Sequence, residues 1–327
     1  MEAVNLSSIH RFIPLIFLLL TVHGYAQSGW TDRSTPAVKE DLVAVYFTSA
    51  NNGWIGGDHG FLSSTTDGGR SWVKYPLNTE EDVNEIYFRN DKIGYVVAGK
   101  KLFITSDSGR TWQETRIFRF ADFKNGVPEF LSIRFADKKR GIIVGSVLNK
   151  DDRVVDSLVM RTEDGGETWQ RVIVPSKAEL IHLDANHGSN VWVVGDDGVI
   201  LASTDGGNTW RTQPSGTNLP LYNVDFHDSN EGYIVGKAGT ILKTENGGAT
   251  WNRIETNFRD TFMRVDFTND KNGWIVGYSG SIISSSDRGK TWTRQESGTS
   301  LKLYGLYMNK KFGWAVGEKG AILSFRK

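Results

Sequence analysis

The residues of this 327-residue sequence that most suggest a catalytic or metal-binding role lie in six copies of a motif centred on an aspartate. Each copy reads Ser/Thr-x-Asp-x-Gly-x-Ser/Thr-Trp, and an asparagine replaces the aspartate in the fifth. Carboxylates can bind metals, but each copy supplies only one, and an amide keeps hydrogen bonding without charge. At a turn, such a side chain can accept backbone N–H groups while glycine supplies a positive φ. We therefore predict structural roles, with no metal site, for Asp67, Asp107, Asp164, Asp205, Asn246 and Asp287.

Few other residues suggest catalysis. The sequence has no cysteine, which excludes disulfides, thiolate metal sites and cysteine nucleophiles. Its 38 basic side chains balance 38 acidic ones, which argues against a nucleic acid partner. No histidine lies in a zincin or serine-hydrolase motif, and His182-Leu183-Asp184 is interpreted as packing within a strand. No cofactor is expected.

The elements that carry the motif repeat with a period near forty residues. The motif tryptophans lie 40, 57, 41, 41 and 41 residues apart. A second motif, of apolar residues ending in glycine, occurs seven times, as in Trp192-Val193-Val194-Gly195. Each unit thus contains four short β segments, and the aspartate motif forms the hairpin between the third and the fourth. The predicted fold class is all-β, a seven-bladed β-propeller.

The count of strands predicts how the ring closes. The final unit, residues 303–327, has only three strands, whereas Gly29-Trp30-Thr31-Asp32-Arg33 resembles an isolated fourth strand. We therefore predict that the N-terminal strand completes the last blade. All 11 tryptophans then have scaffold positions: six in aspartate motifs, four in second strands, and Trp30 in the closing strand. None remains for a ligand platform.

The N-terminus has the pattern of a signal peptide. Arg11 precedes an apolar run, residues 12–22, and Gly24-Tyr25-Ala26 offers the small residues of a cleavage site. We predict that residues 1–26 are a signal peptide and that residues 27–327 form one propeller domain, exported to the periplasm or the cell exterior. An uncleaved anchor is the alternative, although the run is shorter than the roughly 20 residues that span a bilayer. No transmembrane segment is expected in the mature chain.

The third blade is the irregular one, because the 57-residue interval contains two insertions. They are residues 115–124, before its first strand, and residues 149–156, between its second and third strands; we expect both on the face opposite the aspartate hairpins. Long loops on a rigid scaffold often carry function. The first insertion mixes aromatic and basic side chains, which suits docking of a protein partner. Its candidate residues are Arg116, Phe118, Arg119, Phe120 and Lys124; the alternative is that its aromatics fold over their own blade.

The whole repeat, including the aspartate motif known as the Asp-box or BNR repeat, resembles the photosystem II stability/assembly factor family. The resemblance is clearest over residues 221–327 and covers essentially all of the mature chain. It implies a seven-bladed, exported, non-enzymatic propeller that binds a membrane-protein precursor, partly through basic residues. Arg116, Arg119, Arg259 and Arg264 are the candidates for such a basic patch. The expected partner is a membrane-protein precursor or another envelope protein, and the chain is expected to act as a monomer.

Two other classes of protein share these repeats. Sialidases carry Asp-boxes, but they have six blades and an early Phe/Tyr-Arg-Ile-Pro segment, for which this chain offers only Ile117-Phe118-Arg119-Phe120 and Phe262-Met263-Arg264-Val265. Xyloglucan-cleaving enzymes with similar repeats need two propellers. A glycoside hydrolase using loop carboxylates, or a secreted propeller that binds glycans without catalysis, therefore remains the alternative.

Overall fold

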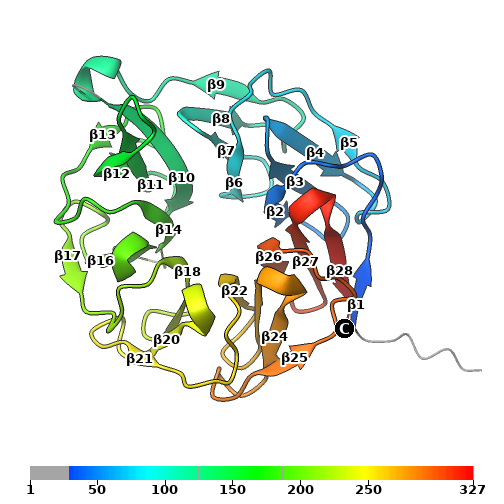
Figure 1. Cartoon of the computed structure of the whole chain (residues 1–327). Coiled ribbons are helices and arrows are strands. Elements are labelled where there is room, and N and C mark those ends of the chain that lie inside the picture. The colour runs from blue at the N-terminus through cyan, green and yellow to red at the C-terminus, as the bar shows by residue number, and fades with distance from the viewer. Residues whose placement is uncertain (1–28, 124–125, 186–187, 327) are drawn as a thin grey trace, which may run out of the picture.

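The computed structural model describes residues 29–123, 126–185 and 188–326, which form a closed ring of seven four-stranded antiparallel sheets (Figure 1). This arrangement confirms the predicted seven-bladed β-propeller. In the first six blades the innermost strand comes first in sequence, and the next three follow outward through hairpins. Among the described residues, no helix is long and apolar enough to cross a membrane.

The strands of the first four blades are short, except in the third blade. There the three inner strands extend to eight or nine residues, which reflects the longer interval in the sequence. The blades are β2 (Leu42–Phe47), β3 (Gly53–Gly57), β4 (Phe61–Thr65) and β5 (Val73–Lys74); β6 (Val83–Phe88), β7 (Gly94–Ala98), β8 (Lys101–Thr105) and β9 (Gln113–Thr115); β10 (Val127–Phe135), β11 (Gly141–Leu148), β12 (Val154–Thr162) and β13 (Gln170–Arg171); and β14 (Leu180–Ala185), β15 (Val191–Gly195), β16 (Ile200–Ser203) and β17 (Arg211–Gln213).

The last three blades follow the same plan, and short 3₁₀ turns join several second and third strands. The strands are β18 (Leu221–Phe226), β19 (Gly232–Gly236), β20 (Ile241–Thr244) and β21 (Asn252–Arg253); β22 (Phe262–Phe267), β23 (Gly273–Gly277), β24 (Ile282–Ser285) and β25 (Thr293–Gln295); and β26 (Leu303–Met308), β27 (Phe312–Gly317), β28 (Ile322–Arg326) and β1 (Gly29–Asp32). The 3₁₀ helices are η1 (Phe120–Phe123), η2 (Asp196–Gly198), η3 (Lys237–Gly239), η4 (Tyr278–Gly280) and η5 (Glu318–Gly320).

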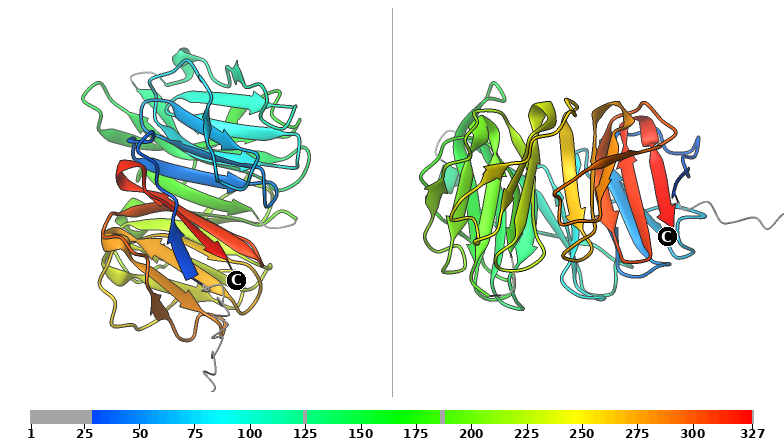
Figure 2. Two further views of the ribbon diagram at one scale, coloured as in Figure 1. Left: turned by 90° about the vertical axis from the view of Figure 1, so that its right-hand side faces the viewer. Right: turned by 90° about the horizontal axis from the view of Figure 1, so that it is seen from below.

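The N-terminal strand closes the ring, as the sequence predicts. Strand β1 pairs with β28 from Gly29 opposite Arg326 to Asp32 opposite Leu323. Figure 2 shows β1, in blue, beside the red strands of the last blade. Trp30 packs against Phe325, with ring centroids 5.5 Å apart. The predicted signal peptide and its cleavage after Ala26 lie outside the described residues and remain predictions.

Aromatic side chains join most neighbouring blades. At five of the seven junctions, the aromatic residue of a second strand packs on the phenylalanine that ends the next blade's first strand, as Trp192 does on Phe226 at a centroid distance of 3.6 Å. The Asp-box tryptophan Trp251 meets the same phenylalanine edge-on, at 85°. Because offset and edge contacts of this kind add to the hydrophobic gain, tryptophan serves the scaffold here. The second-strand glycine is required by close approach: a Cβ on Gly195 would lie 1.9 Å from the Glu179 carbonyl oxygen.

The Asp-boxes form the predicted hairpin turns. In the fourth blade, Asp205 accepts the backbone N–H groups of Asn208 and Thr209 at 3.0 and 2.9 Å, together with the hydroxyls of Ser203 and Thr209. Asn246 accepts the equivalent Thr250 N–H at 2.9 Å. The hydrogen-bonding role therefore does not need a charge. Side-chain and backbone hydrogen bonds lower the pKa of Asp67 to about 2. Hydrogen bonds of the same kind also lower the pKa values of the other Asp-box aspartates.

An alanine at the fourth box should destabilise the protein, whereas an asparagine should not. We expect Asp205→Ala to lower the free energy of unfolding by about 1–2 kcal/mol, because several turn donors lose their acceptor. Asp205→Asn should stay within about 0.5 kcal/mol of the wild type, since it recreates the arrangement found at Asn246. Urea unfolding followed by tryptophan fluorescence measures both variants. Equal losses for the two substitutions would show that the charge matters.

The two faces of the ring differ in the loops that build them. The Asp-box hairpins lie with the hairpins that join first to second strands, as the Gly206 N–H bond to Ser189 O at 2.8 Å shows. The loops that enter first strands lie with those that join second to third strands, as the Asp196 N–H bond to Glu179 O at 3.0 Å shows. We call these the Asp-box face and the upper face.

Candidate functional site

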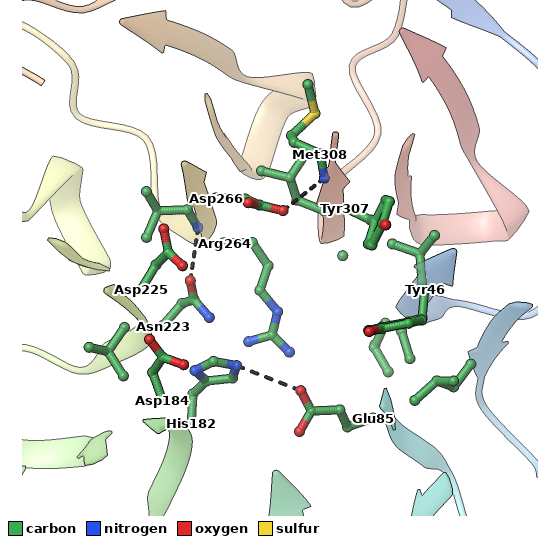
Figure 3. A pocket seen from close by; sticks show the side chains of 18 of the residues that line it. Tyr46, Glu85, His182, Asp184, Asn223, Asp225, Arg264, Asp266, Tyr307 and Met308 are labelled. Carbon is green, nitrogen blue, oxygen red and sulfur yellow. Dashed lines mark hydrogen bonds and ion pairs between the residues drawn. The ribbon is translucent and has the colours of Figure 1, made fainter. Parts of the chain in front are cut away.

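The seven innermost strands surround a polar channel with a cavity of about 270 Å³ (Figure 3). Residues alternate between the two sides of a strand, so each strand sends side chains two residues apart toward the channel. Two layers result. The aspartate layer, nearer the Asp-box face, contains Tyr46, Arg134, Asp184, Asp225, Asp266 and Tyr307. The layer nearer the upper face, here the arginine layer, contains Ala44, Glu85, His182, Asn223, Arg264 and Gly305.

Three aspartates connect neighbouring blades within the aspartate layer. The Oδ2 atoms of Asp184, Asp225 and Asp266 accept the backbone N–H groups of Phe226, Phe267 and Met308, at 2.8, 2.9 and 2.7 Å. Each acceptor is 42 residues before its donor, so the contact repeats from blade to blade. These carboxylates therefore stabilise the ring in addition to lining the channel.

Burial raises the pKa of all three aspartates. The pKa of Asp266 rises to about 7, although the Met308 N–H and the charge of Arg134 oppose the shift. The pKa of Asp225 rises well above its usual value, because repulsion from Asp266 and Asp184 adds to burial. The pKa of Asp184 also rises by burial, against the attraction of Arg134. The aspartate layer thus holds protons at a pH where exposed aspartates have lost theirs.

An ion pair spans the two layers. Arg134 Nη1 donates to Glu85, whose second oxygen accepts the Ile133 N–H at 2.7 Å. Burial alone would raise the pKa of Glu85, but the charge of Arg134 and the contact with His182 hold it far below its usual value. Burial lowers the pKa of His182 to about 4, so this imidazole is neutral at pH 7. Arg134 Nη2 lies 3.1 Å from His182 Nε2.

Arg264 stands in this channel instead of on the outer surface. Figure 3 shows its side chain reaching across the channel toward His182 and Glu85. Its one hydrogen bond to a described residue runs from Nη1 to the Tyr222 carbonyl oxygen at 3.4 Å. Burial, together with repulsion from Arg134, lowers its pKa.

Stability should depend on pH through Asp266. The pKa of Asp266 is about 7 in the folded protein and about 3.9 in the unfolded chain, so the folded state binds a proton more tightly. The favourable contribution of this proton to the free energy of unfolding is therefore present below pH 4 and is lost as the pH rises to 7. We expect the wild type to lose about 2–4 kcal/mol more than Asp266→Asn between pH 4 and pH 7.5. Urea unfolding at several pH values tests this difference. Asp270→Asn, which removes an exposed partner of Arg288, is the control and should follow the wild-type profile; a parallel profile for Asp266→Asn would contradict the prediction.

The first insertion of the third blade packs over the outer edge of its own blade, at the rim of the ring (Figure 1). Phe118 contacts Phe123 and Phe130 edge-on, at centroid distances of 5.5 and 5.8 Å, so part of the aromatic set folds inward. Phe120 remains 55% exposed. A cavity of about 580 Å³ lies between this loop and the neighbouring Asp-box. Its lining includes Arg116, Phe118, Arg119, Phe123, Trp169 and Arg171.

The predicted site residues do not form one patch. Arg119 pairs with Asp122 at 3.1 Å on the rim, and Arg116 is exposed beside it. Arg259 lies before the sixth blade, across the ring, where it bonds the carbonyl oxygens of Thr256 and Phe258 at 2.9 Å. Arg264 is in the channel, and Lys124 lies outside the described residues. A role for these residues in binding a partner stays a prediction.

The sequence interpretation missed the channel. His182 does lie within a first strand and is only 4% exposed, but it lines the cavity together with Asp184 instead of packing in an apolar core. A signal was present, because Asp184, Asp225 and Asp266 recur at intervals of 41 residues. Each occupies the same position of a first strand, where an apolar or aromatic residue would have been expected for packing alone.

Comparison with known protein families finds one family model that matches the repeats of the whole ring. The family model described as "Photosynthesis system II assembly factor YCF48" matches residues 23–118, 71–178, 120–221, 167–259, 208–301 and 260–326. These overlapping matches include strands from all seven blades. The chain belongs to this family. The predicted membership among photosystem II assembly factor-like propellers is therefore confirmed.

Individual relatives of the YCF48 family are distant. "Photosystem II stability/assembly factor HCF136, chloroplastic" of Arabidopsis thaliana is 28% identical over 93 residues, 26% of this chain and 23% of that protein, so the match spans less than a quarter of the curated relative. A solved structure described as "YCF48 bound to D1 peptide" has a TM-score of 0.74 and 18% identity, covering 91% of this chain and 97% of the other. The GH74 xyloglucanase from Xanthomonas campestris has a TM-score of 0.67 and 12% identity, covering 91% of this chain and 54% of the other. These two structural likenesses show the fold alone.

Proposed function

We propose that this chain is an exported, non-enzymatic propeller that binds a segment of another protein during its assembly. Membership in the YCF48 family supports this role, as does the D1 peptide bound to one member's structure. The proposed partner is a membrane-protein precursor or another envelope protein, and the propeller acts as a monomer after removal of its signal peptide.

The observation that carries the proposal is that exposed apolar side chains are concentrated around the third blade. Of the six large hydrophobic residues exposed within the described part of the chain, five lie in the third blade, in its insertion or in the connection that follows it. Ile173 is 79% exposed, and the others are Phe120, Val127, Val154 and Val155. A fold of seven similar blades does not require such a concentration on one of them. Exposed apolar side chains concentrated in one region of a protein often mark an interaction site.

The main alternative is an Asp-box glycoside hydrolase or a glycan-binding propeller. The channel offers several carboxylates, but Asp184, Asp225 and Asp266 already accept backbone N–H groups from neighbouring blades. Its cavity of about 270 Å³ is also small beside the roughly 300–1,000 Å³ of typical ligand clefts. These features argue against a glycoside hydrolase active site in the channel. Turnover of sialosides or β-glucan oligosaccharides that disappears in Asp225→Asn would overturn the proposal.

Partner capture from a membrane envelope extract tests the third-blade surface. The wild type is compared with Arg116→Glu/Arg119→Glu, which reverses charge at the rim of the cavity. The control is Arg70→Glu/Arg110→Glu, which changes two exposed arginines in the Asp-boxes of the first and second blades. We expect a protein that is retained by the wild type and the control but lost from the third-blade variant. Identical partners for all three proteins would place the contact elsewhere.

A further inference from the structure

The aspartate layer of the channel has hydrogen-bonding capacity that the ring does not use. Each of its three carboxylates uses Oδ2 to accept a backbone N–H from the next blade. Asp184 Oδ1 accepts the Ala185 N–H at 2.9 Å. The Oδ1 atoms of Asp225 and Asp266 make no hydrogen bond with any other described residue. Two carboxylate oxygens on neighbouring blades are therefore available to a donor in the channel.

More acidic than basic side chains line the channel, which favours binding of a cation. Four carboxylates line it, against two guanidinium groups. Arg134 is already committed to Glu85 and lies over the ring of Tyr87, 5.2 Å from its centroid. Tyr46 and Tyr307 also lie in the aspartate layer, and their ring centroids are 5.5 Å apart. Carboxylates combined with aromatic faces are typical of sites that recognise organic cations.

His182 provides a second, independent observation that points to a ligand. His182 Nε2 lies 3.1 Å from Arg134 Nη2 and 3.7 Å from Glu85 Oε1, so Nδ1 is the ring nitrogen left for another partner. His182 is 4% exposed, and its Nδ1 is buried without a hydrogen-bond partner among the described residues. Figure 3 shows this ring in the channel beside Asp184. A buried polar nitrogen without a hydrogen-bond partner is costly unless a ligand or a water satisfies it.

We propose that the channel binds an alkylammonium group, whose N–H donors are accepted by the free Oδ1 atoms of Asp225 and Asp266, while His182 Nδ1 forms a hydrogen bond with the ligand or with a bridging water. An ammonium suits this site better than a metal ion, because no group of three or more His, Asp or Glu side chains in the described residues could hold a metal. A cavity of about 270 Å³ suits a group the size of a lysine side chain. The ammonium could belong to a free amine or to a lysine of a bound segment. This site is separate from the third-blade surface and does not depend on it.

Binding of the cation should release protons. The groups facing Asp266 are Asp225, Asp184, Arg134 and Tyr307, and beyond them lie Glu85, His182, Arg264, Tyr46 and Tyr87. Of these, the aspartates whose pKa is raised by burial and mutual repulsion hold protons in the empty channel. An ammonium favours their ionised forms, so affinity should rise between pH 5.5 and pH 8.

Isothermal titration calorimetry with two probes tests the proposal on the full mature chain. The probes are n-butylammonium chloride and the peptide Gly-Lys-Gly amide with a blocked N-terminus, each titrated at pH 5.5 and pH 8 in two buffers of different ionisation enthalpy. We expect binding of one ligand per chain, tighter at pH 8, with proton release. Tighter binding of n-butylammonium indicates a free amine, tighter binding of the peptide indicates a lysine side chain, and comparable binding indicates that the site recognises the ammonium group from either source.

The matched variants keep the ring intact while removing charge. Asn at position 225 or 266 retains an oxygen to accept the Phe267 or Met308 N–H, so Asp225→Asn/Asp266→Asn should fold, as circular dichroism and unfolding can verify. We expect this variant to bind about tenfold more weakly or worse, because charge-assisted hydrogen bonds are lost. Asp270→Asn should bind as the wild type does. Equal affinity of the charge-removed variant, no heat from either probe, or binding of calcium chloride in place of both amines would overturn the proposal.

Discussion

A Glu85→Ala variant is expected to lose about 3–5 kcal/mol of unfolding free energy at pH 7. Glu85 is 6% exposed, accepts the Ile133 N–H at 2.7 Å and forms an ion pair with Arg134. Without its carboxylate, Arg134 keeps its charge inside the channel, and the Ile133 N–H loses its acceptor. Breaking one side of a buried pair costs far more than the pair itself contributes. Urea unfolding followed by tryptophan fluorescence measures the loss.

The control for this prediction removes both charges at once. Glu85→Gln/Arg134→Met retains a side-chain oxygen for the Ile133 N–H and leaves no unpaired guanidinium. We expect it to be more stable than Glu85→Ala, although it changes more residues, because replacing a whole buried pair is often nearly neutral. A Glu85→Ala variant within 1 kcal/mol of the wild type would mean that Asp184 or water fully compensates Arg134.

Removal of the closing strand should have the second large effect. A chain that begins at Ser34 lacks β1 and Arg33, whose Nε donates to Ser324 Oγ at 3.1 Å. The last blade then has three strands, Phe325 loses its contact with Trp30, and β28 becomes an unprotected edge. We expect a lower urea midpoint, loss of a single cooperative transition, and self-association, because exposed strand edges template pairing between chains.

Unfolding curves and size-exclusion chromatography measure these effects, with two controls. Trp30→Ala keeps the backbone pairing of β1 and should be intermediate, because only the half-buried indole is lost. A synthetic peptide of residues 27–34, added in excess to the shortened chain, should restore the cooperative transition. A shortened chain that is monomeric and as stable as the wild type would show that three strands suffice in the last blade.

Most of the fold could be predicted from the sequence because its determinants are local and repeated. The Asp-box fixes a hairpin through atoms within a few residues of Asp205, and the second-strand glycine marks where a backbone must approach closely, as at Gly195. Repetition then gives the number of blades, and an unpaired strand at Trp30 gives the closure. Each of these features can be read without knowledge of distant contacts.

The candidate site could not be predicted in the same way, because it is built from residues that meet only when the ring forms. Asp184, Asp225 and Asp266 are visible as a periodic series, but their common destination depends on which side of each first strand faces the axis. The environment of His182 depends on Glu85 and Arg134, from two other blades. The length of the third-blade loop marks it as irregular in the sequence, whereas its position over the outer rim follows from the packing of Phe118 on Phe130.

The pairing of β1 with β28 also sets the order in which the protein can be completed. Gly29 is among the first described residues to be synthesised and its partner Arg326 among the last, so this contact spans about 300 residues of chain. Contacts between such distant segments form slowly, because the entropy of closing a long loop must be overcome before the contact contributes stability. Each of the other six blades is contiguous in sequence and can be assembled as the chain emerges. The ring therefore stays open until the final strand has been made, and a prematurely terminated chain has no means of closing.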